Sequence, residues 1–136
     1  MSSFTDSIIE EFRANGGVVT RPYPDSTLVL LTLRGARSGR VYTLPIEYME
    51  DGGHLYIFAT AGGAPKHPSW YHNLRANPEV TVEYLTDRFP AIAHEITGDE
   101  RDRLWRELVA RKPRFAEYET PSSRIYPAFR LDRVPD

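Results

Sequence analysis

Two extended segments joined by a short turn constrain the fold of this chain more than any other feature of its sequence. The segment STLVLLTLRG (26–35) is almost wholly apolar, and VYTLPIEYME (41–50) alternates well enough for a second strand. Such short apolar or alternating runs are typical of β-strands. Asp51-Gly52-Gly53 is then a strong hairpin signal into a third extended run, HLYIFAT. The first half of the chain is therefore predicted to form antiparallel hairpins.

The second half of the chain continues the same pattern. EVTVEYL (79–85) and RFPAIAHEI (88–96) are predicted strands on either side of a turn. RIYPAFRLDRV (124–134) is predicted to close the fold as a further strand. Pro90 removes one donor from the ladder, so its strand is predicted to lie at a sheet edge or to carry a bulge.

Helices are predicted to flank these strands. Phe4, Ile8 and Phe12 recur every four residues and predict a helix within residues 1–16. Thr97 is followed three residues later by a glutamate, which is the spacing of a capping box and predicts a second long helix. Strands grouped in hairpins with separate helices favour an α+β fold, an antiparallel barrel or sheet, over a parallel sheet.

Length and composition set the remaining bounds. With 136 residues, 40% hydrophobic and 26% charged, the chain is expected to form one domain, residues 1–136. It has no cysteine, which excludes disulfides and thiolate metal sites, and its net charge of -2 argues against broad nucleic-acid binding. The N-terminus lacks the basic start and long apolar run of a signal peptide, so a cytoplasmic location is expected.

No residue pattern indicates a metal centre or a side-chain nucleophile. His67 and His72 are five residues apart, so they would not share one face of a helix, and no carboxylates cluster beside them. A zinc site is therefore not expected. No serine lies in a nucleophile-elbow sequence, which argues against a serine hydrolase.

The turn GARSGR (35–40) is the first segment with the composition of a ligand site. Its glycines allow close approach of the backbone, and its exposed amides with Arg37, Ser38 and Arg40 suit an anion. A solvated turn that carries charges for solubility is the alternative.

The segment TAGGAPKHPSWYHNLRANPEV (60–80) is the second segment with the composition of a ligand site. It predicts a short helix that begins at Pro68 and ends at Asn77. Trp70 and Leu74 are four residues apart on one face, which predicts that both side chains plug one end of the barrel. This structural role alone leaves the neighbouring glycines, lysine and asparagine unexplained.

These motifs resemble those of the deazaflavin-dependent nitroreductase family, the actinobacterial reductases that use coenzyme F420. The resemblance rests on EFRANGG (11–17), LVLLTLRGARSGR (28–40), GGAPKHPSWYHNLRANPEV (62–80) and RIYP (124–127). It implies a split β-barrel of mainly antiparallel strands with flanking helices, which agrees with the strand pattern above.

The resemblance also implies a cofactor site. It includes a turn for the anionic tail, a strand along the deazaflavin ring, a strand end beneath the ring, and a helix start that closes over the cofactor. Arg37, Arg40 and Lys66 are expected to form a basic groove for the tail. The implied cofactor-binding residues are Arg37, Ser38, Gly39, Arg40, Tyr42, Thr43, Leu44, Pro45, Phe58, Ala59, Thr60, Ala61, Gly62, Gly63, Lys66, Ser69, Trp70, Tyr71 and Asn73.

The chain departs from the family pattern at three positions. Tyr42 stands where many relatives have arginine, and Ala61 where they often have lysine or another polar residue. Phe115 aligns with a substrate-facing tyrosine, while the next aromatic, Tyr118, is kept. Because phenylalanine cannot donate a proton, nitro-group reduction is expected to be poorer than reduction of enones or quinones.

The resemblance implies transfer of a hydride from reduced coenzyme F420 to an electron-poor enone, quinone or nitroaromatic. Phe115, Tyr118 and Tyr126, with Trp105, are expected to line the substrate pocket, and Thr60 or Tyr118 to be a proton donor. The alternatives are a barrel that binds flavin mononucleotide (FMN) and a non-catalytic deazaflavin carrier.

The apolar stripe of the N-terminal helix leaves one question of location open. A helix that faces the core is the ordinary interpretation, whereas the same stripe also suits a helix on a lipid surface. The second interpretation would place the protein peripherally at the inner face of the membrane.

Overall fold

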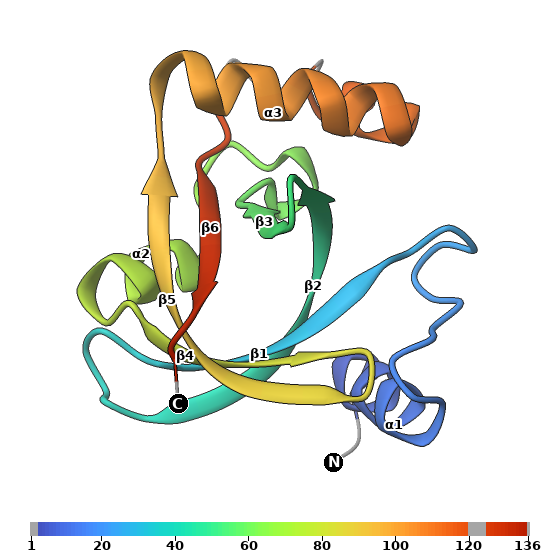
Figure 1. Cartoon of the computed structure of the whole chain (residues 1–136), viewed down its shortest axis with the longest axis vertical. Coiled ribbons are helices and arrows are strands. Elements are labelled where there is room, and N and C mark those ends of the chain that lie inside the picture. The colour runs from blue at the N-terminus through green and yellow to red at the C-terminus, as the bar shows by residue number, and fades with distance from the viewer. Residues whose placement is uncertain (1–2, 120–124, 136) are drawn as a thin grey trace.

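Six strands close into one antiparallel barrel (Figure 1). The computed structural model describes residues 3–119 and 125–135. The order around the barrel is β1-β2-β3-β6-β5-β4, and β4 pairs back with β1. The strands are β1 (Leu28–Arg34), β2 (Val41–Asp51), β3 (His54–Phe58), β4 (Glu79–Tyr84), β5 (Asp87–Ile96) and β6 (Ala128–Arg133). The predicted antiparallel barrel with flanking helices is confirmed.

Helices cover the two ends of the barrel. Figure 1 shows α3 across one end and α1 beside the opposite end. Within the two described stretches of chain, no helix combines the length and the apolar character that crossing a membrane requires. The α-helices are α1 (Phe4–Ala14), α2 (Ser69–Ala76) and α3 (Gly98–Arg111), and the short 3-10 helices are η1 (Ala61–Gly63) and η2 (Pro113–Glu119).

The almost wholly apolar sequence of β1 follows from its position between two apolar clusters. Val29 and Leu31 point into the barrel interior with the side chains of the other strands. Leu28 and Leu30 alternate with them and pack against Ile8 of α1 and its neighbours. Because successive side chains of a strand face opposite sides, both faces of β1 must be apolar. The N-terminal stripe is therefore used, at Ile8 and at Phe12, for packing on the barrel.

A third apolar cluster attaches α3 to the outside of the barrel. Leu104, Trp105 and Leu108 of this helix are buried against Tyr56 and Phe58 of β3. The ring centroids of Phe58 and Trp105 are 5.5 Å apart in an edge-on arrangement. This cluster fixes η2, which directly follows α3, over the end of β3.

The prediction that Pro90 lies at a sheet edge or on a bulge is wrong, because β5 is paired on both sides and its register with β4 runs unbroken through Pro90. β5 pairs with β4 along Pro90, which is opposite Thr81, and with β6 from Ala91 onward. The Pro90 carbonyl accepts a hydrogen bond from the Val134 amide at 2.9 Å, just past the end of β6. Its missing donor thus falls where the ladder to β6 ends, so the barrel tolerates a proline inside a strand that is paired on both sides.

Two helix and strand ends also differ from the sequence prediction. Thr97 is the N-cap of α3, but its side chain makes no capping hydrogen bond, because the helix begins at Gly98 with φ 67°. A capping box instead begins α1, where Ser3 Oγ accepts from the Asp6 amide at 3.0 Å. The closing strand begins at Ala128 rather than at residue 124, which lies outside the described residues.

Gly17, after the end of α1, provides a test of how tightly this end of the helix packs against the β4–β5 turn. Its φ is 87°, and a Cβ there would lie 2.4 Å from Leu85 Cα. Gly53 in the β2–β3 hairpin has a similar φ of 83°, but nothing lies within 4 Å of a Cβ. Both substitutions to alanine incur left-handed strain of about 1–2 kcal/mol.

We therefore predict that Gly17→Ala lowers the free energy of unfolding by about 2–5 kcal/mol, because overpacking adds to the strain. Gly53→Ala should lower it by about 1–2 kcal/mol. Urea denaturation of the two variants measures the difference. Equal losses would show that α1 and the β4–β5 turn shift apart at no cost.

Candidate active site

A polar groove lies between the β1–β2 turn and the first turn of α2. Its volume is about 600 Å³. Turn residues 35–38 form one side, and α2 residues form the other. The groove is lined by Gly35, Ala36, Arg37, Ser38, Tyr42, Ser69, His72 and Asn73.

Asn73 holds the two sides of this groove together. Its Oδ1 accepts from the Ala36 amide at 2.9 Å, and its Nδ2 donates to the Tyr42 hydroxyl oxygen at 2.7 Å. Within the turn, Gly35 lies so close to Ser38 that a Cβ on Gly35 would be 2.6 Å from Ser38 Oγ. Since Tyr42 accepts from Asn73, its own hydroxyl hydrogen is left to donate to an acceptor in the groove.

The groove is suited to an anion. Arg37 lines it, and no carboxylate is among its lining residues in the described chain. Of the three residues expected to form a basic groove, Arg37 lines this one, whereas Arg40 and Lys66 are exposed and do not line it. Arg40 sits at the end of the turn, where its amide donates to Ser38 Oγ at 3.1 Å.

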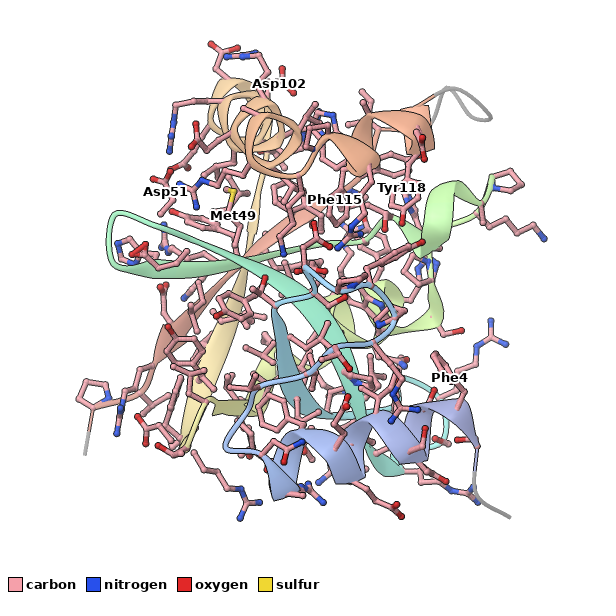
Figure 2. The ribbon with its side chains drawn as sticks, turned by 90° about the vertical axis from the view of Figure 1, so that its right-hand side faces the viewer. Phe4, Met49, Asp51, Asp102, Phe115 and Tyr118 are labelled. Atoms are coloured by element: carbon pink, nitrogen blue, oxygen red, sulfur yellow. The ribbon has the colours of Figure 1, made fainter. Side chains whose placement is uncertain are left out.

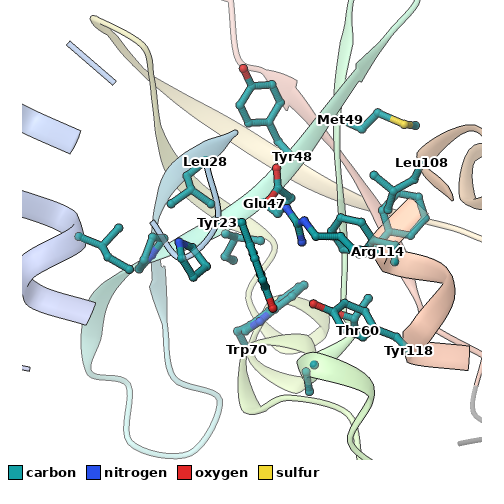
Figure 3. Close-up of a pocket in the computed structure, with 18 of the residues that line it drawn as sticks. Tyr23, Leu28, Glu47, Tyr48, Met49, Thr60, Trp70, Leu108, Arg114 and Tyr118 are labelled. Carbon is teal, nitrogen blue, oxygen red and sulfur yellow. Dashed lines mark hydrogen bonds and ion pairs between the residues drawn. The ribbon is translucent and has the colours of Figure 1, made fainter. Parts of the chain in front are cut away.

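An aromatic pocket lies further along β2, with a volume of about 330 Å³ (Figure 3). Figure 2 places Phe115 and Tyr118 on the α3 side of the molecule and Phe4 on the α1 side. The groove and the pocket border the same turn of α2, through Ser69 and Trp70 respectively. The pocket walls include Phe4 and Ile8 (α1), Pro22 and Tyr23 (the loop before β1), Pro45 to Met49 (β2), Thr60 to Gly62 (after β3), Trp70 (α2), and Arg114, Phe115 and Tyr118 (η2).

A network of charged groups reinforces one wall of the pocket. Glu47 of β2 accepts from Lys112 Nζ at 2.5 Å and from Arg114 Nη2 at 2.8 Å. The Thr27 hydroxyl donates to the same carboxylate at 2.6 Å. The side chains of Glu47 and Arg114 are only 16% and 18% exposed, so solvent screens this ion pair less than a surface pair. Burial is the largest single influence and opposes the Arg114 charge, but the hydrogen bonds and charges of Glu47 and Asp25 together outweigh it and raise the pKa of Arg114.

Two tyrosines in the pocket are held in the neutral form. Burial, followed by a hydrogen bond with Tyr23, raises the pKa of Tyr118, although the neighbouring Arg114 acts in the opposite direction. Burial and the adjacent Tyr84 raise the pKa of Tyr48 to about 12. Both phenols therefore carry their protons at neutral pH and can act as hydrogen-bond donors.

The structure divides the residues assigned from the sequence between these two cavities. The groove contains Arg37, Ser38, Tyr42, Ser69 and Asn73. The pocket contains Pro45, Phe58, Thr60, Ala61, Gly62, Trp70, Phe115 and Tyr118. Neither cavity is lined by Gly39, Arg40, Thr43, Leu44, Ala59, Gly63, Lys66, Tyr71 or Tyr126.

Tyr126 and Trp105 stand behind the pocket rather than in its wall. Tyr126 is 2% exposed and Trp105 is 7% exposed, and their rings are 5.2 Å apart in the α3 cluster. The Tyr126 hydroxyl donates to the Tyr118 carbonyl. This hydrogen bond holds the backbone of Tyr118, and the substrate contact expected of Tyr126 stays a prediction.

Helical spacing predicts that Trp70 is buried, but Tyr71 is the more deeply buried of these two residues. Tyr71 is buried in the barrel core, with its ring 5.9 Å from that of Phe129, and Leu74 is 1% exposed. Trp70 is only half-buried and lines the aromatic pocket. Trp70 also packs against the barrel core, with its ring 6.1 Å from that of Phe129, so its side chain is shared between the core and the pocket.

Sequence reasoning missed the pocket residues that lie outside the family motifs. Tyr23, Glu47 and Arg114 come from three distant segments that only the barrel brings together. One signal was available: Glu47 is a charged residue inside a predicted strand, on the same side as Pro45 and Met49. No local pattern marks Tyr23 or Arg114.

The fold and the two cavities define a split-barrel protein that can hold a ligand with one anionic and one apolar part. A family model described as F420H(2)-dependent quinone reductase matches residues 7–131, and the chain belongs to this family. It is therefore an oxidoreductase, and its cofactor is coenzyme F420.

Individual relatives agree with the family assignment. The chain is 32% identical over 126 residues to an F420H(2)-dependent quinone reductase of Mycobacterium tuberculosis, covering 90% of this chain and 85% of the relative. It is 34% identical over 90 residues to a second, putatively named quinone reductase of that organism, covering 66% of this chain and 73% of the relative. A solved F420-H2 dependent reductase (FDR-A) is 40% identical, with a TM-score of 0.69 over 77% of this chain and 93% of that chain.

Arg37 is predicted to be the principal cation for an anionic ligand tail. Arg37→Ala should weaken binding of coenzyme F420 about tenfold or more, because a charge-assisted hydrogen bond is lost. Arg40→Ala removes the same charge from the same turn, outside the groove, and should change affinity little. Quenching of deazaflavin fluorescence on titration measures both. Equal weakening by the two substitutions would indicate a diffuse electrostatic effect and no specific groove contact.

Leu74 and Trp70 are predicted to differ in what they stabilise. Leu74→Ala should lower the free energy of unfolding by about 2–5 kcal/mol, since it empties a fully buried position. Trp70→Ala removes more atoms but should cost less stability, because the ring is half-exposed in a pocket. Urea denaturation and cofactor titration of both variants test this assignment. A larger stability loss for Trp70→Ala would restore its structural role.

Proposed function

We propose that this protein transfers a hydride from reduced coenzyme F420 to a quinone or an enone, with nitro compounds as poorer acceptors. The observation that carries the proposal is the aromatic pocket, which is enclosed by Tyr23, Trp70, Phe115 and Tyr118 and borders the backbone of Thr60 to Gly62. Flat, electron-poor rings and alkenes are the acceptors that such walls can hold by stacking and burial.

The residues of the two cavities fit the cofactor. In this proposal, Arg37, Ser38 and the Tyr42 hydroxyl bind the anionic tail in the polar groove. Pro45 and the Thr60–Gly62 backbone hold the ring at the edge of the aromatic pocket. Ala61 and Gly62 have φ values of 50° and 63°, so this backbone turns sharply beside the pocket. When bound, coenzyme F420 supplies the hydride, and the chain binds and orients both partners and excludes water.

Phe115 supports the order of acceptors. It is 4% exposed at the pocket wall, edge-on to Tyr118 with ring centroids 5.3 Å apart. Its ring offers no hydroxyl to a nitro oxygen, whereas a reduced enone or quinone requires a proton only after the hydride has arrived. Tyr118, with its raised pKa, is the proposed donor of that proton.

Phe115→Tyr is predicted to shift the reaction toward nitro compounds. The ratio of kcat/KM for a nitroaromatic to kcat/KM for an enone should rise about tenfold or more, as expected for a gained proton donor. Phe4→Tyr makes the same chemical change at the 59%-exposed rim of the pocket and should leave the ratio unchanged. The assay follows loss of reduced-cofactor absorbance with enones, quinones and nitroaromatics. Tight cofactor binding without turnover of any acceptor would favour a deazaflavin carrier instead.

A further inference from the structure

Arg114 occupies an unusual position for a charged residue in an aromatic pocket. Its guanidinium carbon lies 4.1 Å from the ring centroid of Tyr23 and 4.6 Å from that of Phe115. It lines the same pocket as Thr60 and Tyr118 (Figure 3). The guanidinium therefore lies against two aromatic rings at the pocket wall.

Two carboxylates fix the orientation of this guanidinium. Arg114 Nε donates to Asp25 at 3.2 Å, and Nη2 donates to Glu47 at 2.8 Å. Glu47 is itself held by Lys112, so Arg114 is bound to a partner that cannot swing away. A guanidinium has five N–H donors, and these two bonds leave donors for an oxygen inside the pocket.

The charges around Arg114 balance. Arg114 and Lys112 face Glu47 and Asp25, two cations against two carboxylates. A balanced wall does not require an anionic partner from solution, so a neutral carbonyl compound can bind beside it. The fixed donors then act on charge that develops during the reaction, which is how a pre-oriented site stabilises an oxyanion.

Tyr118 provides a second donor on the same wall. It lines the pocket together with Tyr23 and Arg114, and both of these residues affect its pKa. Tyr118 is itself only half-buried, so a proton that it gives up can be replaced from solvent.

We propose that Arg114 and Tyr118 together form an oxyanion site that binds the carbonyl oxygen of the acceptor. This inference rests on the proposed function and deepens it. As the hydride bonds to the acceptor carbon, the π electron pair moves to the carbonyl oxygen, which becomes an enolate or hydroquinone anion. Arg114 stabilises this charge, Tyr118 then supplies one proton, and solvent restores the proton of Tyr118. The acceptor gains two electrons and two hydrogens in total.

The same site makes Arg114 a residue that determines specificity. Acceptors with a carbonyl oxygen conjugated to the reducible bond place developing charge where the donors lie. Electron-poor alkenes without such an oxygen gain nothing from them, so the site selects carbonyl acceptors over other activated alkenes.

A phenol whose ionisation is visible tests the oxyanion site without cofactor or turnover. We choose 4-nitrophenol, whose phenolate resembles the product anion, and titrate it by absorbance in the presence of the protein. The parent protein should bind the phenolate at least about tenfold more tightly than the phenol, as a charge-assisted hydrogen bond implies. The bound phenol then loses its proton at a lower pH than the free phenol.

Substitutions assign this preference to Arg114. Arg114→Met should abolish it, whereas Arg106→Met, which removes the same charge from an exposed position on α3, should leave it intact. Tyr118→Phe should reduce it, and Arg114→Lys should retain only part of it, because a lysine keeps the charge without the planar fork. Urea denaturation shows whether each variant is folded. If Arg114→Met is not folded, the Lys and Phe variants decide the assignment.

The outcomes separate this inference from the proposed function. Absence of 4-nitrophenol binding, equal affinity for phenol and phenolate, or an unchanged preference in the Arg114 variants would overturn the oxyanion site. A clear phenolate preference that depends on Arg114 supports it even if no acceptor is turned over. In that case the proposed reaction fails, while the anion site stands.

Discussion

Pairing of β4 with β1 is the interaction on which the rest of this structure depends. Leu31 lies opposite Val82 across that ladder, and both side chains are fully buried. Closure removes the free edges of the sheet and encloses one continuous apolar interior. It also requires the chain to travel from the end of β3 to the start of β4, and η1 and α2 form on that path. Both cavities lie beside this crossing.

One wall of the aromatic pocket is formed by the barrel itself, and the other is formed by segments that pack onto the barrel. β2 and the end of β3 belong to the barrel, whereas α1, the loop before β1 and η2 are packed onto it. Arginines join these outer segments. Arg21 donates to the Ser7 side chain and carbonyl of α1 at 3.0 Å, and Arg114 ties Asp25 of the loop to Glu47 of β2. These polar contacts add to the apolar packing of Ile8, Phe12 and Phe115, so both kinds of contact hold the outer segments around the pocket.

Much of the fold was predictable because β-hairpins and helix stripes are local patterns. The strands, the GARSGR turn and the helix that ends at Asn77 follow from neighbouring residues alone. Predictions failed where a distant partner decided the outcome. The sequence predicts that Pro90 lies at a sheet edge. Its strand is paired on both sides, but the missing Pro90 donor falls where β6 ends, so the strand tolerates the proline. Spacing places Trp70 with Leu74, and both pack against the barrel core, but Tyr71 is buried there as well and Trp70 is left half-exposed at the pocket.

The sequence by itself determined the barrel class, the position of the turn around Arg37 and the family with its cofactor, because each depends on contiguous residues. Only the tertiary structure decided which arginine and lysine residues reach the groove, and that Arg40 and Lys66 do not. It alone brought Tyr23, Glu47 and Arg114 together, from a loop, a strand and a 3-10 helix that are far apart in the chain. A polar wall built from such distant segments leaves no local signature, since no period or motif connects its members.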